Sequence, residues 1–274
     1  MSKDYIKFWG VRGSHPTPDI DKVNFGGDTS CIEVSFGNEL IILDMGSGIR
    51  NLGDAMLKNK NTPKTVHIFL SHFHWDHIVG FLNFKPLFDS SFTFNIYGTN
   101  PNTDIKNITK KLLDPTLWPV SLEMLKAKIN FINLDENHLK INDGVVVEHT
   151  QHPHPNGATS YKISKNNFSI LYTTDCEHTN NILNKNVIKI ANNADIMIHD
   201  SHFTDEDLLN HVGWGHSSWK NAVDVAKIAN VKKLILFHFS PEYNDEKISK
   251  IESKAKQSFE NTIASKQGLK IELI

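Results

Sequence analysis

A short segment of the sequence, Ser71–His77, concentrates side chains that bind metal ions: His72, His74, Asp76 and His77. It directly follows the apolar run Val66–Leu70, which predicts a buried strand. Side chains alternate along extended backbone, so the two histidines two residues apart are expected to point the same way. A turn after them would present the remaining two ligands to a neighbouring point. This spacing favours two adjacent metal ions. Imidazole and carboxylate ligands favour zinc, with manganese or iron as alternatives.

Three further apolar runs lead into residues of the same chemical types. Val145–Val147 is followed by His149, His152 and His154, Ser169–Tyr172 by Asp175, and Leu234–Phe237 by His238. Sheets of α/β proteins place their sites in loops at strand ends, so Asp175 and His238 are candidate ligands. Spacing alone leaves His152 and His154 as alternatives.

The elements that must position these residues are read from hydrophobic periodicity. Eight apolar, β-branched runs predict strands, at 31–36, 40–43, 66–70, 92–97, 145–147, 169–172, 196–198 and 234–237. Helical spacing is present at 49–56, at 222–229 after the capping pair Ser217–Ser218, and at 248–263 up to Gly268. Strands with interspersed helices predict a layered α/β protein.

Composition excludes several classes of protein. The 274 residues carry 29 basic and 31 acidic side chains, a net charge of −2, so no global field attracts nucleic acid or an anionic membrane. No apolar run is long enough to span a membrane, and the N-terminal residues do not resemble a signal peptide. The two cysteines, Cys31 and Cys176, form neither a disulfide framework nor a redox pair. We therefore expect a cytoplasmic protein.

Several motifs together resemble a known family. The metal-binding segment is joined by Phe8–Ser14, Gly26–Ser30, Leu43–Gly48, His154–Ala158, Thr174–His178 and Gly213–Ser217. The pattern resembles the metallo-β-lactamase-fold hydrolases, in particular a phosphodiesterase branch that includes relatives of ribonuclease Z and phosphonate-pathway cyclic phosphodiesterases. The resemblance implies a single domain over residues 1–274, folded as a four-layer αββα sandwich.

The resemblance also implies a set of ligands for two divalent cations. One metal would be held by His72, His74 and His154, the other by Asp76, His77 and His238, with Asp175 bridging the two. It favours His154 over His152, because His154-Pro-Asn-Gly-Ala158 matches the family's His-Pro-Gly-Gly-Ala pattern. A β-lactamase usually has cysteine at the bridging position, so Asp175 argues against that activity.

Catalytic roles follow from the same resemblance. His216 is the candidate general acid, Asp200 would hold its imidazolium, and Asp76 would orient the nucleophile as well as bind metal. For His216 and Asp200, helix capping is the alternative role. Additional roles are open for four residues, with structural roles as the alternative: orientation of a ligand histidine for Asp44, contact with substrate phosphate for Arg12 and Ser14, and lining of the site for His178.

The sequence thus predicts a metal-dependent phosphodiesterase that acts on a small or cyclic nucleotide-like phosphodiester through a metal-bound hydroxide. One alternative is a tRNA 3′-processing endonuclease of ribonuclease Z type. The short, mixed-charge segment Asn95–Asn130 shows no basic arm for tRNA, so a large nucleic acid is not the expected partner. A non-catalytic metal-binding regulatory module is a second alternative. A homodimer is left open, and no membrane partner is expected.

Overall fold

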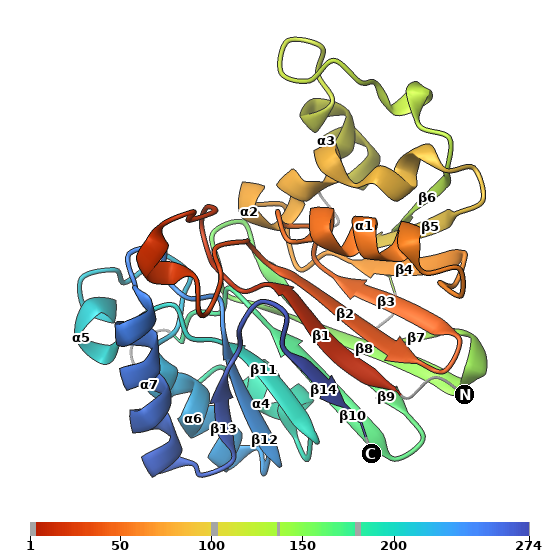
Figure 1. Ribbon diagram of the computed structural model, residues 1–274. Coiled ribbons are helices and arrows are strands. Elements are labelled where there is room, and N and C mark those ends of the chain that lie inside the picture. Colours follow the sequence, from red (N-terminus) through yellow and green to blue (C-terminus); the bar gives the residue numbers. More distant parts are fainter. Residues whose placement is uncertain (1–3, 100–103, 136–137, 179–181, 274) are drawn as a thin grey trace. The chain divides into compact units, whose positions relative to one another are not determined.

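Two seven-stranded mixed sheets form the framework of the computed structural model, which describes residues 4–99, 104–135, 138–178 and 182–273 (Figure 1). Each sheet belongs to a separate compact unit. The first unit comprises residues 1–10, 28–135 and 268–274, and the second comprises 11–27 and 136–267. The single domain over 1–274 stays a prediction.

The sheet of the first unit joins the two ends of the described chain. Its strands lie in the order β14 (Lys270–Glu272), β1 (Tyr5–Gly10), β2 (Cys31–Phe36), β3 (Glu39–Leu43), β4 (Thr65–Phe69), β5 (Thr93–Gly98) and β6 (Lys128–Asn133). The first three pairings are antiparallel and the last three are parallel. All five residues of β3 are buried, as expected for a strand covered on both faces.

The sheet of the second unit repeats this pattern of strand directions. Its order is β7 (His138–Lys140), β8 (Val145–His152), β9 (Ala158–Lys165), β10 (Phe168–Thr173), β11 (Ile196–Asp200), β12 (Lys233–Phe237) and β13 (Thr262–Ala264). Again three antiparallel pairings are followed by three parallel ones. All eight predicted strands are present. However, β8 continues to His152, so His149 and His152 lie within the strand and not in the loop after it.

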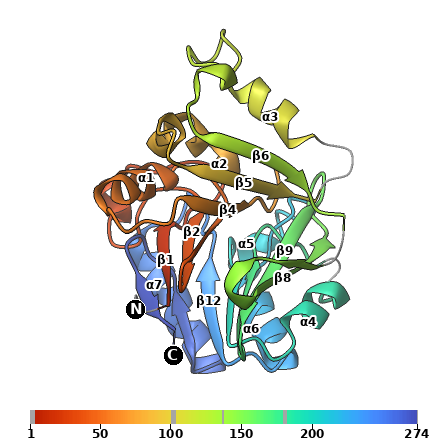
Figure 2. The same cartoon turned by 90° about the vertical axis from the view of Figure 1, so that its right-hand side faces the viewer.

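Helices of the first unit pack on its own sheet. They are α1 (Ile49–Lys58), α2 (Trp75–Ile78) and α3 (Ile105–Leu112). Short 3₁₀ turns of the same unit span Val79–Asn83, Lys85–Phe88 and Leu122–Met124, and one in the second unit spans Ile20–Lys22. Ile49, Leu52 and Met56 recur at helical spacing on α1 and are buried against residues of β3 and β4. Figure 2 shows α3 beside β6.

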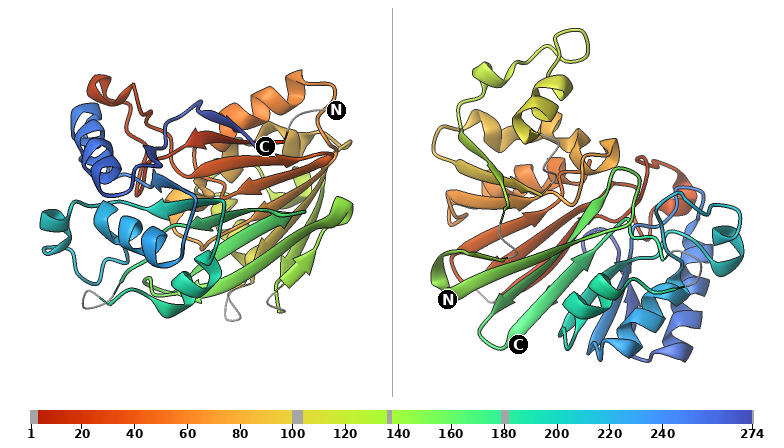
Figure 3. Two further views of the ribbon diagram at one scale, coloured as in Figure 1. Left: turned by 90° about the horizontal axis from the view of Figure 1, so that it is seen from below. Right: turned by 180° about the vertical axis from the view of Figure 1, so that it is seen from behind.

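Helices of the second unit cover its sheet. These are α4 (Lys185–Ala191), α5 (Asp205–Leu208), α6 (Trp219–Ile228) and α7 (Asp245–Ser258), and a further 3₁₀ turn spans Asn142–Gly144. Contacts join α4, α6 and α7 to strands of the second sheet (Figure 3). The expected continuation of the last helix through Phe259 and Ile263 was wrong. Phe259 adopts extended backbone, and the following residues form β13 parallel to β12, where edge pairing overrides the helical spacing.

In the part of the chain that the structure describes, no helix has the length and apolar character needed to cross a membrane.

Helix α6 begins at a capping box, which the serine pair predicted. The Ser218 hydroxyl accepts a hydrogen bond from the Asn221 backbone N–H, and the Asn221 side chain accepts one from the Ser218 N–H. We expect Ser218→Ala to lower the free energy of unfolding by about 1 kcal/mol in urea denaturation, because an N-terminal N–H of the helix loses its acceptor. Ser253→Ala, at an exposed position inside α7, is the matched control and should cause no loss. Equal effects of the two substitutions would contradict the capping role.

Candidate metal centre

The histidine-rich segment of the first unit is organised by one buried aspartate. Asp44 follows β3 and is fully buried. Its carboxylate accepts hydrogen bonds from the Ser71 backbone N–H at 2.7 Å, from the Ser71 hydroxyl at 2.8 Å and from His77 Nδ1 at 2.7 Å. Asp44, at the end of β3, therefore holds in place both Ser71, at the start of the loop after β4, and the His77 imidazole on α2. This is the orienting role expected for Asp44.

These hydrogen bonds set the tautomers of two histidines. His77 donates from Nδ1 to Asp44, so its lone pair is on Nε2, 3.2 Å from a carboxylate oxygen of Asp76. The Ser71 hydroxyl donates to Asp44 and lies 3.0 Å from His72 Nδ1, so that nitrogen donates to the hydroxyl oxygen. Consequently His72 also carries its lone pair on Nε2. Its ring contacts that of His74, with centroids 4.5 Å apart, in agreement with side chains that share a direction.

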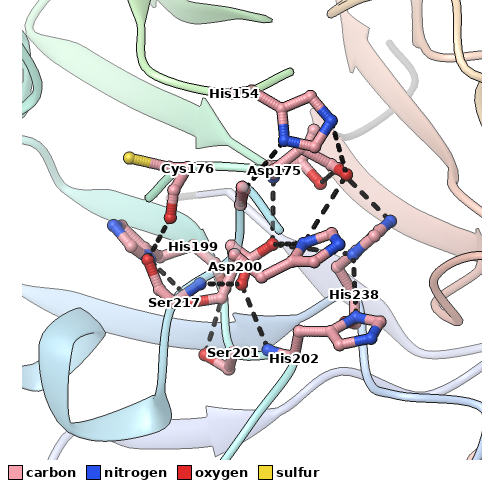
Figure 4. Close-up of polar contacts among 12 residues, drawn as sticks. His154, Asp175, Cys176, His199, Asp200, Ser201, His202, Ser217 and His238 are labelled. Atoms are coloured by element: carbon pink, nitrogen blue, oxygen red, sulfur yellow. Dashed lines mark hydrogen bonds and ion pairs between the residues drawn. The ribbon is translucent and has the colours of Figure 1, made fainter. Parts of the chain in front are cut away.

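In the second unit, Asp175 lies between two imidazoles (Figure 4). Its carboxylate oxygens are 3.7 Å from His154 Nε2 and 3.2 Å from His238 Nε2. His154 donates from Nδ1 to the carbonyl oxygen of Gly215 at 2.9 Å, which leaves the lone pair on the nitrogen that faces Asp175. Metal-binding histidines usually hold their second nitrogen in this way.

The donor sets of both units fit a divalent cation. Two ligands that are each about 2.0–2.2 Å from a tetrahedral ion lie roughly 3.3–3.6 Å from each other. Separations of 3.2 Å in the first unit and of 3.2 and 3.7 Å in the second are close to this value. Oxygen and imidazole nitrogen are also the ligand types that zinc, manganese and iron accept. The structure thus brings together Asp76 with His77, and Asp175 with His154 and His238, each within its own unit.

Asp200 is the hydrogen-bonding centre of the second unit's cluster. The side chain, at the end of β11, is fully buried. It accepts hydrogen bonds from three backbone N–H groups, those of Asp175, His202 and Ser217, at 2.9–3.1 Å. Burial by itself raises the pKa of Asp200, but the neighbouring His216 and His238 imidazoles outweigh it and lower the pKa to about 2. The residue is therefore an ionised acceptor, and it does not cap α5, whose cap is Thr204.

His216, the candidate general acid, is held directly by this carboxylate. Its Nδ1 is 3.0 Å from Asp200 and 3.7 Å from Asp175. The alternative role as a helix cap does not apply, because Ser218 caps α6. The His202 ring stacks on His216 at a centroid distance of 4.1 Å, and it was missed as a site residue by sequence reasoning. Its place two residues after Asp200, at the same strand end, was the available signal.

The choice between His152 and His154 follows from hydrogen bonds. His152 Nε2 donates to the carbonyl oxygen of Thr174 at 3.0 Å, and its Nδ1 accepts from the Ser160 hydroxyl at 3.0 Å. Both ring nitrogens are engaged by the protein, and burial lowers the pKa of His152 to about 4. This neutral, fully bonded imidazole has a structural role.

The remaining expectations concern Arg12, Ser14 and His178. Arg12 is fully buried in the second unit, donates to backbone carbonyl oxygens of Gly26 and Tyr243, and lies 3.9 Å from a carboxylate oxygen of Asp245. These contacts give Arg12 a structural role, which was the alternative to contact with substrate phosphate. Ser14 is exposed, so a contact with substrate stays a prediction. His178 accepts from a backbone N–H through Nδ1 and stacks on His199.

Comparison with known proteins gives the family. A family model described as the beta-lactamase superfamily domain matches residues 41–239, which is most of the chain. The chain belongs to this family. It is 25% identical over 314 aligned positions to a ribonuclease Z of Archaeoglobus fulgidus, with 98% of this chain and 97% of the relative covered. It is 27% identical to a ribonuclease Z of Picrophilus torridus, with 96% and 94% covered.

Solved structures establish the fold. The metallo-β-lactamase fold protein YhfI from Bacillus subtilis gives a TM-score of 0.75 at 18% identity and covers 100% of both chains. A diphosphatase from the PhnP family gives 0.72 at 16% identity, with 99% and 98% covered. The short form of human tRNase Z gives 0.70 at 18% identity, with 98% and 99% covered. The predicted metallo-β-lactamase fold is confirmed, and the chain is a member of this hydrolase superfamily.

The central role of Asp200 predicts a large loss of stability on amide substitution. In Asp200→Asn the –NH₂ group would face N–H donors, and a buried charge pair would lose its anion. We expect the free energy of unfolding to fall by about 3 kcal/mol or more in urea denaturation. Asp89→Asn, at a partly exposed turn residue that also accepts a backbone N–H, is the control and should stay within about 0.5 kcal/mol of the unmodified protein. A small, equal change in the free energy of unfolding of both variants would contradict the role of Asp200 as the hydrogen-bonding centre of the cluster.

Proposed function

We propose that this superfamily member is a phosphodiesterase that uses two divalent cations to hydrolyse a small or cyclic nucleotide-like phosphodiester. The observation that carries the proposal is the arrangement in the second unit. There a buried carboxylate, Asp175, faces the Nε2 atoms of two imidazoles, and a histidine held by a second buried carboxylate stands 3.7 Å away. A metal-binding group beside a proton donor is what phosphoester hydrolysis requires.

The cations would be held by the donors already described. His72, His74, Asp76 and His77 come from the first unit, and His154, Asp175 and His238 from the second. Zinc is the proposed metal, with manganese or iron as alternatives. When bound, two such cations supply a water of lowered pKa and Lewis-acid stabilisation of the phosphate oxygens.

The chain's own residues would provide the proton transfer. His216 donates from Nδ1 to Asp200, so a protonated ring carries its second proton on Nε2. From there the proton would pass to the leaving oxygen, and Asp200 would stabilise the imidazolium that exists before transfer. Asp76 would orient the attacking water as well as bind metal.

Ribonuclease Z activity is the second candidate, because it is the activity named for the curated relatives. The two candidates differ in the size of the substrate. The alignment with the Archaeoglobus relative spans 314 positions, so that protein has segments that this 274-residue chain lacks. Between β5 and β6, the described residues form only a short helix and a 3₁₀ turn, and residues 100–103 lie outside the described part. A net charge of −2 further disfavours a tRNA-sized partner.

Turnover of two substrate classes tests the proposal. Protein loaded with manganese, zinc or iron is expected to hydrolyse bis-p-nitrophenyl phosphate and at least one cyclic nucleotide, and to lose activity after chelation. A precursor tRNA with a 3′ trailer serves as the competing substrate. Turnover of the tRNA alone would favour the ribonuclease Z reading, and turnover of none of the three would overturn the proposal.

The proton-donor role predicts the effect of His216→Ala. We expect kcat to fall by roughly 10²–10⁴-fold with an alkoxide leaving group while the metal content is unchanged, because the leaving oxygen departs without a proton. Steady-state kinetics and elemental analysis of the same samples measure both quantities. His138→Ala, at an exposed histidine of the same unit, is the control. Loss of metal from the His216 variant would show instead that His216 is a ligand.

The bridging role predicts the effect of Asp175→Ala. Two adjacent cations would repel each other, so removal of the carboxylate that is proposed to be shared between them should release at least one of them. Elemental analysis after dialysis against a weak chelator measures the stoichiometry, with Asp89→Ala, at a partly exposed turn residue, as the control. Two metals retained at full occupancy in the Asp175 variant would refute the bridge.

A further inference from the structure

Within the segment that carries His216, the Trp214 N–H donates to the carbonyl oxygen of His211 at 3.1 Å, and the rings of these two residues are in contact. Gly213 and Gly215 flank Trp214, and both glycines have positive φ angles, 87° and 86°. Glycine has the largest backbone freedom of any residue, so this Gly-Trp-Gly sequence is flexible unless its polar groups are bound. Trp214 has 61% of its surface exposed, so its side chain does not anchor the segment in the core.

One carboxylate binds the segment at both glycines. Glu177, in the loop after β10, accepts a hydrogen bond from the Gly213 N–H at 2.7 Å through Oε1 and from the Gly215 N–H at 2.9 Å through Oε2. Hydrogen bonds to an ionised acceptor are about twice as strong as those between neutral groups. Both carboxylate oxygens are used, one for each end of the turn around Trp214.

Glu177 is itself fixed to the loop that carries a proposed metal ligand. Its backbone N–H donates to the carbonyl oxygen of Pro153 at 3.1 Å. The next residue, His154, donates from Nδ1 to the carbonyl oxygen of Gly215. A closed ring of hydrogen bonds therefore joins the loops before His154, after Asp175 and before His216. The fit is close, because a Cβ atom on Gly215 would lie 2.0 Å from His154 Nδ1.

We infer that Glu177 is a positioning residue for the proposed hydrolysis: its two hydrogen bonds to the Gly-Trp-Gly turn set the place of the His216 imidazole. The inference rests on the proposed function, in which His216 gives a proton to the leaving oxygen. Glu177 acts only through the position of His216, and its own carboxylate takes no part in the proton transfer. A displacement of about 1 Å in a catalytic group can lower a rate by about 100-fold.

Leaving-group dependence separates this role from a general structural one. The substrates are the methyl ester and the p-nitrophenyl ester of thymidine 5′-monophosphate, which differ only in the leaving group. p-Nitrophenolate leaves readily without a proton, whereas methoxide needs one. At saturating metal, Glu177→Ala should lower kcat about 10–100-fold for the methyl ester and less than about 3-fold for the p-nitrophenyl ester, with KM little changed. Glu177→Gln keeps one acceptor oxygen, so its kcat for the methyl ester should lie between those of the unmodified protein and Glu177→Ala.

Two controls complete the kinetic test. Glu260→Ala removes an exposed carboxylate of the same unit and should leave both rates unchanged. The double variant Glu177→Ala/His216→Ala should be no slower than His216→Ala alone, because both substitutions remove the same proton transfer. Equal losses with the two esters, or multiplicative losses in the double variant, would overturn the inference.

A spectroscopic measurement keeps the test independent of turnover. In protein labelled with 5-fluorotryptophan, the ¹⁹F resonance of Trp214 is assigned by its absence in Trp214→Phe. Glu177→Ala should shift or broaden this resonance and leave that of Trp9, in the first unit, unchanged. If the unmodified protein hydrolyses neither ester, the proposed function fails while this measurement still decides whether Glu177 holds the turn. An unchanged Trp214 resonance would overturn the inference.

Discussion

One fully buried carboxylate, Asp200, organises the second unit's site, because hydrogen-bond donors must surround it. An ionised group away from water is stable only when donors surround it, and three backbone N–H groups and one imidazole do so here. Those donors come from the loops that carry Asp175, His202 and Ser217. The requirement of a single side chain thus holds together the loop after β10, the loop after β11 and the segment before α6. Asp44 has the same function on a smaller scale in the first unit.

Backbone conformation at the strand ends adds a second constraint. Asp44, Asp175 and His238 all have positive φ angles, of 60°, 52° and 63°. This left-handed conformation costs roughly 1–2 kcal/mol for a residue with a side chain, although aspartate tolerates it better than most residues. It turns the chain sharply after a buried strand and points the side chain out of the sheet. The hydrogen bonds around each residue offset that cost, so the site combines local strain with dense polar contacts.

The sequence predicted the features that depend on local pattern. Buried strands were visible as apolar runs, and ligand-type residues such as Asp175 and His238 were recognised because they directly follow such runs. Features that depend on packing among loops were not predicted. The structural role of His152 comes from a serine on the neighbouring strand, and the stacking of His202 on His216 joins two loops. The end of α7 at Ser258 was likewise missed, because pairing with β12 decides it.

The shared order of strand directions in the two sheets gives each unit the same place for a polar side chain. In each sheet the fourth strand, β3 or β10, is the last of the antiparallel series, and each is followed within two residues by a left-handed aspartate, Asp44 or Asp175. Each unit thus places a left-handed aspartate at the same point of an equivalent sheet. In the first unit that aspartate orients a histidine, and in the second it faces the imidazoles of His154 and His238.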